Sequence, residues 1–153
     1  MNSWTVRNNY LIPLISELID KLVGKKHFTK MNLRWGYNNV RIKKSDEWKA
    51  AFTTPDRAFE LTVMYFGLMN LPSTFQTMMN NIFQDLINRG LVIIYIDDIL
   101  IATESLVGHR EIVEEVLQRL LDNDLFIKPE KCIMYPTCDK LLNRIRVTPG
   151  NPR

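Results

Sequence analysis

Residues 91–102 read Leu91-Val-Ile-Ile-Tyr-Ile-Asp-Asp-Ile-Leu-Ile-Ala102. Apolar, mostly β-branched runs on both sides of Asp97 and Asp98 predict a β-hairpin whose strands are buried on both faces. One interpretation is a plain turn, because aspartate is favoured in turns. The other is that the hairpin presents two carboxylates to Mg²⁺, since a divalent cation relieves both their mutual repulsion and their lost hydration.

The chemistry that such a hairpin serves normally needs a third acid. Phosphoryl and nucleotidyl transfer commonly use two divalent ions about 4 Å apart, which hold the attacking and leaving oxygens. The natural donor of a further carboxylate is the strand predicted near residue 30. That strand carries Asn32, and a neutral amide is a poor ligand for a divalent cation.

Apolar spacing predicts helices and strands mixed along the chain. The clearest helix begins near Pro72 and stops by Gly90, because Met and Phe side chains recur between them at every third or fourth position. Further helices are expected at 13–23 and 107–121, strands at 27–33, 40–43, 48–53 and 59–64, and a turn at 54–57. Hairpins without regular β-α-β alternation predict an α+β fold.

The composition is that of a single globular domain. The 153 residues are 46% hydrophobic and 24% charged, which excludes disorder and low complexity. No apolar run approaches the roughly 20 residues that span a bilayer, and the start lacks a signal-peptide pattern. We therefore expect no membrane contact and an intracellular location, cytoplasmic or nuclear. Cys132 and Cys138 predict neither a disulfide framework nor a zinc site, so a reducing compartment is expected.

The net charge of +3 is unevenly distributed. Residues 1–49 carry 10 Lys and Arg against 4 Asp and Glu, whereas residues 50–153 carry 10 against 13. A basic first third attracts nucleic-acid phosphates. The alternative interpretation is a solvated lysine surface.

Five motifs follow one another along the chain. They are Phe28-Thr-Lys-Met-Asn-Leu-Arg-Trp-Gly-Tyr37, Asp46-Glu-Trp-Lys-Ala-Ala-Phe52, Phe66-Gly-Leu-Met-Asn-Leu-Pro-Ser-Thr-Phe-Gln76, Tyr95-Ile-Asp-Asp98 and Lys128-Pro-Glu-Lys-Cys132. In this order they resemble motifs of the reverse transcriptases of gypsy-type long-terminal-repeat retrotransposons. The first, third, fourth and fifth resemble F-x-K-x-D-L-x-x-x-Y, F-G-L-x-N-A-P-x-x-F-Q, Y-x-D-D and K-x-E-K-C. The second is similar to the strand that follows the first of these motifs in the family. The resemblance extends from about Thr5 to Leu142.

This resemblance implies a reverse-transcriptase palm with partial fingers, in which a small antiparallel sheet is backed by helices. It implies RNA-directed DNA polymerase activity with two Mg²⁺ or Mn²⁺ ions, a template-primer of RNA or DNA, dNTPs, and other segments of a retroelement polyprotein as partners. The site residues it implies are Asp97 and Asp98 as metal ligands, the Leu33 carbonyl towards a metal, Tyr37 under the sugar of the nucleotide, Gln76 against that nucleotide, and Lys131 near its phosphates.

The sequence also departs from the family pattern. Asn32 stands where the family places its first catalytic aspartate. Leu141-Leu142-Asn143 replaces the aromatic-Leu-Gly turn that contacts the primer, and Arg144 and Arg146 follow in a strand that is normally apolar. Residues 1–153 are expected to form one domain without thumb, connection or nuclease domains.

Two hypotheses follow from these matches and departures. The first is a palm whose nucleotidyl transfer is impaired by Asn32 and by truncation. The second is a non-catalytic retroelement remnant that folds and binds nucleic acid through its basic first third. For two residues the plain interpretations stay open: Tyr37 as a core aromatic, and Gln76 as a side chain facing solvent.

Overall fold

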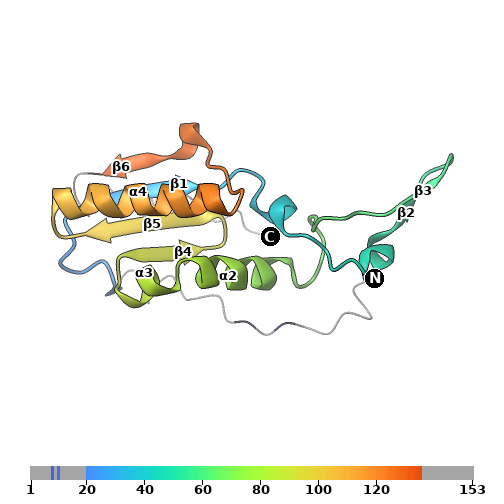
Figure 1. Cartoon of the computed structure of the whole chain (residues 1–153), viewed down its shortest axis with the longest axis horizontal. Coiled ribbons are helices and arrows are strands. Elements are labelled where there is room, and N and C mark those ends of the chain that lie inside the picture. The colour runs from blue at the N-terminus through green and yellow to red at the C-terminus, as the bar shows by residue number, and fades with distance from the viewer. Residues whose placement is uncertain (1–7, 9, 11–19, 136–153) are drawn as a thin grey trace, which may run out of the picture.

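The computed structural model describes residues 8, 10 and 20–135, and its centre is one antiparallel sheet (Figure 1). The strands of this sheet are β1 (His27–Asn32), β4 (Val92–Tyr95), β5 (Asp98–Thr103) and β6 (Ile133–Tyr135). They lie in the order β4-β5-β1-β6, and every neighbouring pair is antiparallel. The hairpin predicted at residues 91–102 is thus confirmed as β4 and β5.

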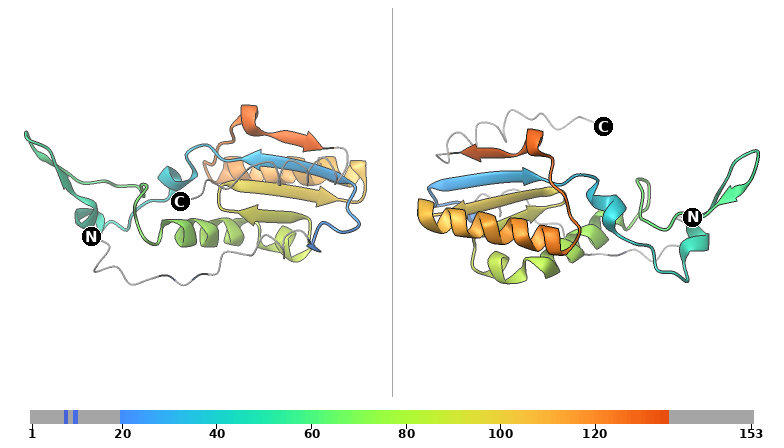
Figure 2. Two further views of the ribbon diagram at one scale, coloured as in Figure 1. Left: turned by 180° about the vertical axis from the view of Figure 1, so that it is seen from behind. Right: turned by 45° about the horizontal axis from the view of Figure 1, so that its top comes forward.

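Three helices pack on one face of the sheet (Figure 2). They are α2 (Leu71–Ile82), α3 (Gln84–Asn88) and α4 (Leu106–Asp122). The core between helices and sheet is built from buried apolar side chains, chiefly Met31, Phe75, Met79, Phe83, Leu86, Val92, Ile94, Ile99, Ile101, Ile112, Val116 and Leu120. The opposite face buries Phe28, Ile93 and Ala102 beneath Leu22. Around Phe28, Ile93 and Ala102 both faces of the sheet are therefore covered, as the apolar runs predict, whereas Lys30 and Asp98 on the same face are half-buried.

The ends of α4 follow from local chemistry. The Ser105 hydroxyl accepts a hydrogen bond from the Gly108 N–H at 3.2 Å, which caps the first turn. The helix ends where Asn123 and Asp124 follow, and Asp124 takes a positive φ of 55°. Leu121 lies in the last turn of the helix, and its side chain is 60% exposed.

A two-stranded arm extends away from the sheet (Figure 1). It consists of β2 (Phe52–Thr53) and β3 (Ala58–Phe59), which pair Phe52 with Phe59. The predicted turn at 54–57 is confirmed, since the Thr54 N–H donates to the Arg57 carbonyl at 2.9 Å. The expected strands 40–43 and 59–64 meet at a single bridge between Arg41 and Val63.

Other expectations need correction. Residues 48–50 are not a strand but belong to the 3-10 helix η3 (Glu47–Ala50), where Lys49 pairs with Asp46 at 2.7 Å and Trp48 is 64% exposed. The helix expected from near Pro72 to Gly90 is interrupted at Phe83, whose φ of −113° and ψ of 16° lie outside helical values. Most of the helix expected at 13–23, the 141–146 segment and Cys138 lie outside the described residues. Of the described helices, none has the length and apolar character needed to cross a membrane.

A buried histidine ties α4 to the sheet. His109 Nε2 lies 2.7 Å from Thr29 Oγ1 on β1, and its Nδ1 lies 3.0 Å from Thr103 Oγ1 on β5. Burial, and then the nearby His27, lowers the pKa of His109 below its usual 6.5. The neutral ring therefore belongs to the folded state.

We expect the stability of the fold to depend on pH through His109. Because the pKa of His109 is lower in the folded than in the unfolded chain, protonation of this ring favours unfolding. The contribution of His109 to the free energy of unfolding is therefore complete above pH 6.5, and it is lost as the pH falls towards the folded-state pKa. Urea midpoints measured from pH 8 down to pH 5, for the native chain and His109→Gln, check this. The native midpoint should fall more steeply than that of the variant, and parallel curves would contradict the assignment.

Candidate active site

Three polar side chains meet on the sheet face opposite the helices. Antiparallel register places Asn32 of β1 directly across from Asp98 of β5. Lys30 lies on the same face, because alternate residues of a strand point to the same side. Asp97 is in the two-residue loop that joins Tyr95 to Asp98.

Asn32 is hydrogen-bonded to both acids, and Lys30 forms an ion pair with Asp98. Asn32 Nδ2 donates to Asp98 Oδ1 at 2.8 Å and to Asp97 Oδ2 at 3.3 Å. Lys30 Nζ lies 2.9 Å from Asp98 Oδ2. The other amide atom, Asn32 Oδ1, is buried without a hydrogen-bond partner. The site thus combines two carboxylates, one cation and one amide whose nitrogen faces the acids.

Gln76 holds the hairpin from the helix side. Its Oε1 accepts from the Ile96 N–H at 2.8 Å, and its Nε2 donates to the Ile94 carbonyl at 3.1 Å and to Asn80 Oδ1 at 2.9 Å. The side chain is fully buried, so the interpretation that Gln76 faces solvent is wrong. Its contact with a nucleotide stays a prediction.

The turn that Gln76 holds has an unusual backbone. Ile96 has a φ of 56°, a conformation that β-branched residues rarely adopt. The hydrogen bonds of Gln76 to the Ile96 N–H and the Ile94 carbonyl keep this strained turn in place. The turn sets the position of Asp97, which follows Ile96.

Tyr37 lies on the short 3-10 helix η2 (Gly36–Asn39), near enough to Asp97 to feel its charge. Its ring makes edge contacts with Phe66 and Phe75, each at 5.2 Å between centroids. Burial, followed by the charges of Asp97 and Tyr95, raises the pKa of Tyr37. Tyr37 is therefore both a packed aromatic and a neighbour of Asp97.

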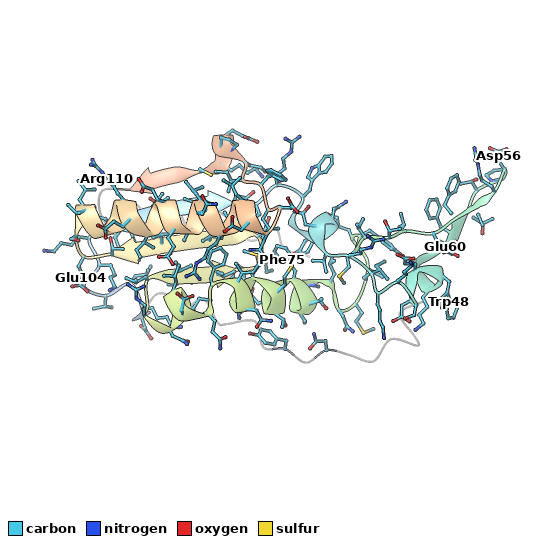
Figure 3. The ribbon with its side chains drawn as sticks, viewed as in Figure 1. Trp48, Asp56, Glu60, Phe75, Glu104 and Arg110 are labelled. Carbon is cyan, nitrogen blue, oxygen red and sulfur yellow. The ribbon has the colours of Figure 1, made fainter. Side chains whose placement is uncertain are left out.

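Phe75 fixes the approach of η2 to α2. Figure 3 shows Phe75 at the N-terminal part of α2, and a Cβ added at Gly36 would lie 2.7 Å from its ring carbon Cζ. A glycine is required at residue 36 for this close approach.

The two remaining predicted residues have different surroundings. Leu33 is buried, and its N–H donates to the Asp97 carbonyl at 2.8 Å, so it joins β1 to the loop. Lys131 is exposed on the 3-10 helix η4 (Pro129–Lys131), which follows Lys128, whose N–H donates to the Asn32 carbonyl at 2.8 Å.

Sequence reasoning missed Lys30 as a member of the site. The signal was available, because residues 30 and 32 alternate onto one face of a predicted strand. The backbone role of Gln76 had no such signal, since it depends on how α2 packs behind the hairpin.

The residues present do not fit the two divalent ions that the resemblance implies. Within residues 8, 10 and 20–135, His, Cys, Asp and Glu side chains form no group of three or more that could hold a metal ion. Both oxygens of Asp98 already accept from Asn32 and Lys30. A cation between the acids would meet an N–H donor at Asn32 instead of an oxygen ligand.

Comparison with known proteins agrees with this architecture. The family model described as reverse transcriptase (RNA-dependent DNA polymerase) matches residues 2–142. The Tf2-3 transposon polyprotein of Schizosaccharomyces pombe (strain 972) is 38% identical over 142 residues, and the Tf2-7 polyprotein of the same organism is 37% identical. These matches cover 93% of this chain, which spans 11% of the length of these relatives.

Solved structures show the same fold. The foamy viral protease-reverse transcriptase in complex with an RNA/DNA hybrid superposes with a TM-score of 0.77 at 21% identity, covering 99% of this chain and 22% of that one. A second foamy viral structure, in complex with double-stranded DNA, gives 0.79 at 20% identity over 99% of this chain and 29% of that one. The palm-like α+β fold and the retrotransposon resemblance predicted from the sequence are thus confirmed. With its ordered motifs, its acidic hairpin and the match across residues 2–142, this chain belongs to the reverse transcriptase (RNA-dependent DNA polymerase) family.

Proposed function

We propose that the chain is a polymerase palm that adds dNTPs to a primer on an RNA or DNA template, and that this transfer is impaired at Asn32. The observation that carries the proposal is the acidic pair on a hairpin braced by Gln76, with an amide in the place of a third acid. The foamy viral relatives in complex with an RNA/DNA hybrid and with double-stranded DNA support the choice of template-primer.

The proposed roles follow the placement of the residues. Asp97 and Asp98 are the carboxylates to which Mg²⁺ or Mn²⁺, two ions in an active site of this kind, would bind. With the Asn32 amide donating to both carboxylates, this chain holds such ions poorly. Tyr37, close to Asp97, would lie under the sugar of the incoming nucleotide, and Lys131 would lie towards its phosphates.

Primer extension tests the proposal. The native chain and Asp97→Ala are incubated with a labelled template-primer, dNTPs and either Mg²⁺ or Mn²⁺. We expect weak extension by the native chain and less by Asp97→Ala, because the native chain keeps both acids. Equal extension by the two proteins would contradict the catalytic proposal and favour the second candidate.

The second candidate is nucleic-acid binding without catalysis. Its supporting observation is a set of exposed aromatic residues, each with a cation over its ring. The pairs are Arg34 with Trp35 at 5.5 Å, Lys49 with Trp48 at 5.6 Å, and Arg57 with Phe59 at 5.3 Å. Figure 3 shows Trp48 and Asp56 on the segment that extends away from the sheet. Aromatic faces next to cations suit unpaired bases and their phosphates.

Replacing the two stacked phenylalanines of the arm should weaken binding of single-stranded DNA. Phe52 and Phe59 are 46% and 40% exposed, with ring centroids 5.5 Å apart. Loss of base stacking is worth about 1–3 kcal/mol per base, or roughly tenfold to a hundredfold in affinity. Fluorescence anisotropy of Phe52→Ala/Phe59→Ala measures this, with Leu121→Ala as an exposed apolar control on α4. Equal affinities for all three proteins would remove the arm from the binding surface.

A further inference from the structure

We propose that Asn32 and Lys30 act as a built-in substitute for a divalent cation. In the absence of metal, they hold the carboxylates of Asp97 and Asp98 together. We call the hydrogen bonds from Asn32 Nδ2 and Lys30 Nζ to Asp97 and Asp98 the clasp. The inference rests on the proposed function, and it adds the physical means by which Asn32 impairs the site.

The clasp engages most of the acceptor atoms that a cation would use. Asn32 Nδ2 reaches Asp98 Oδ1 and Asp97 Oδ2, at 2.8 and 3.3 Å, and Lys30 Nζ reaches Asp98 Oδ2 at 2.9 Å. Hydrogen bonds to ionised acceptors are stronger than those between neutral groups. One ammonium charge and two amide protons thus offset two negative charges at the β4–β5 turn of an apolar sheet.

The orientation of the Asn32 amide supports the same conclusion. Asn32 is 9% exposed, and its Oδ1 has no hydrogen-bond partner. The reverse orientation would point the oxygen at two carboxylates, where lone pairs repel. The nitrogen of the amide therefore faces the acids, and its oxygen has no hydrogen-bond partner. A buried acceptor without a partner costs free energy, which here the hydrogen bonds from Nδ2 to the carboxylates offset.

A cation can enter this site only at the expense of the clasp. The Asn32 amide would have to rotate by half a turn to offer its oxygen, and Lys30 would have to leave Asp98. Cation binding and the clasp are thus mutually exclusive states of the same residues, so the native chain should bind Mg²⁺ weakly and remain stable without it.

Asparagine and aspartate at residue 32 should differ in how metal changes the stability of the fold. Asn32→Asp removes the Nδ2 donor and adds a third carboxylate next to Asp97 and Asp98. Of the clasp, the Lys30 ammonium alone remains. Without metal, the three charges repel and the variant is destabilised. With metal, they form a ligand set of three oxygens, and binding to the folded state raises its stability.

Thermal unfolding of the native chain and Asn32→Asp, in EDTA and in millimolar MgCl₂ or MnCl₂, tests the clasp. We expect the native Tm to stay constant, and the Asn32→Asp Tm to be lower in EDTA and to rise by about 5 °C or more with metal. Asn81→Asp adds the same charge at an exposed position of α2, and its Tm should not respond to metal. Mn²⁺ titration by calorimetry should give Asn32→Asp at least about tenfold tighter binding than the native chain.

Two results would overturn the clasp: a native Tm that rises with metal as much as that of Asn32→Asp, or no metal response in either protein. If Asn32→Asp does not fold in EDTA, Lys30→Gln gives the same test, because it frees Asp98 Oδ2 and should make the otherwise native chain respond to metal. An unresponsive Lys30→Gln would also count against the clasp. These melting curves do not require polymerisation, so failure of the clasp and failure of the proposed function remain distinguishable.

Discussion

Asn32→Asp is expected to raise the rate of primer extension by on the order of a thousandfold over the native chain. The substitution restores an anionic oxygen across the sheet from Asp98, at the register position where the structure holds Asn32. One further carboxylate ligand is worth several kcal/mol of transition-state stabilisation, and about 4 kcal/mol corresponds to a thousandfold in rate. Asparagine and aspartate are nearly isosteric, so the backbone of β1 should not change.

Two control proteins make this result specific. Asn32→Asp/Asp97→Ala should return extension to the background, because the added acid acts only with the hairpin pair. Asn32→Ala should not gain activity, since it removes the amide without adding a ligand. If Asn32→Asp extends primers no faster than the native chain, residue 32 is not what limits catalysis.

Gln76→Leu is expected to lower the free energy of unfolding by about 2–5 kcal/mol. The leucine fills the space but leaves the Ile96 N–H and the Ile94 carbonyl without the partner they have in the native fold. Each buried polar group that loses its partner costs about 1–3 kcal/mol. The strained turn at Ile96 loses its brace at the same time, so primer extension by Asn32→Asp/Gln76→Leu should also fall.

Urea unfolding at neutral pH measures the effect of Gln76→Leu. Thr77→Val is the matched control on the same helix, because it removes the 2.8 Å bond from Thr77 Oγ1 to the Ser73 carbonyl but no bond to the hairpin. We expect Thr77→Val to change stability by no more than about 1 kcal/mol. If Gln76→Leu were as stable as Thr77→Val, the brace would contribute little to the fold.

The sequence predicts those parts of the fold whose signals are local. The β4–β5 hairpin follows from two apolar runs around two acids, and α4 follows from a helical stripe bounded by Ser105 and Asn123. The family resemblance of five ordered motifs predicts that Asn32 and the acids share one site, and the strand register brings Asn32 across from Asp98.

The remaining features depend on hydrogen bonds and ion pairs that the apolar pattern does not encode. Trp48 has the apolar character of a strand residue, but a local Asp46–Lys49 pair accompanies a 3-10 turn that leaves its ring in solvent. Gln76 has the character of a surface residue, yet the packing of α2 behind β4 directs its amide at the hairpin backbone. A local turn thus overrides the apolar pattern at Trp48, and tertiary hydrogen bonds override it at Gln76.

NMR of the side-chain NH₂ group of Asn32 shows whether this amide donates to both acids. In uniformly ¹⁵N-labelled protein, we expect two separate, slowly exchanging Nδ2 proton signals. They should move on Asp97→Ala and remain in place when millimolar Mg²⁺ is added. Signals at the position of a free asparagine, or signals that shift with Mg²⁺ as the amide turns its oxygen to a bound ion, would contradict the account.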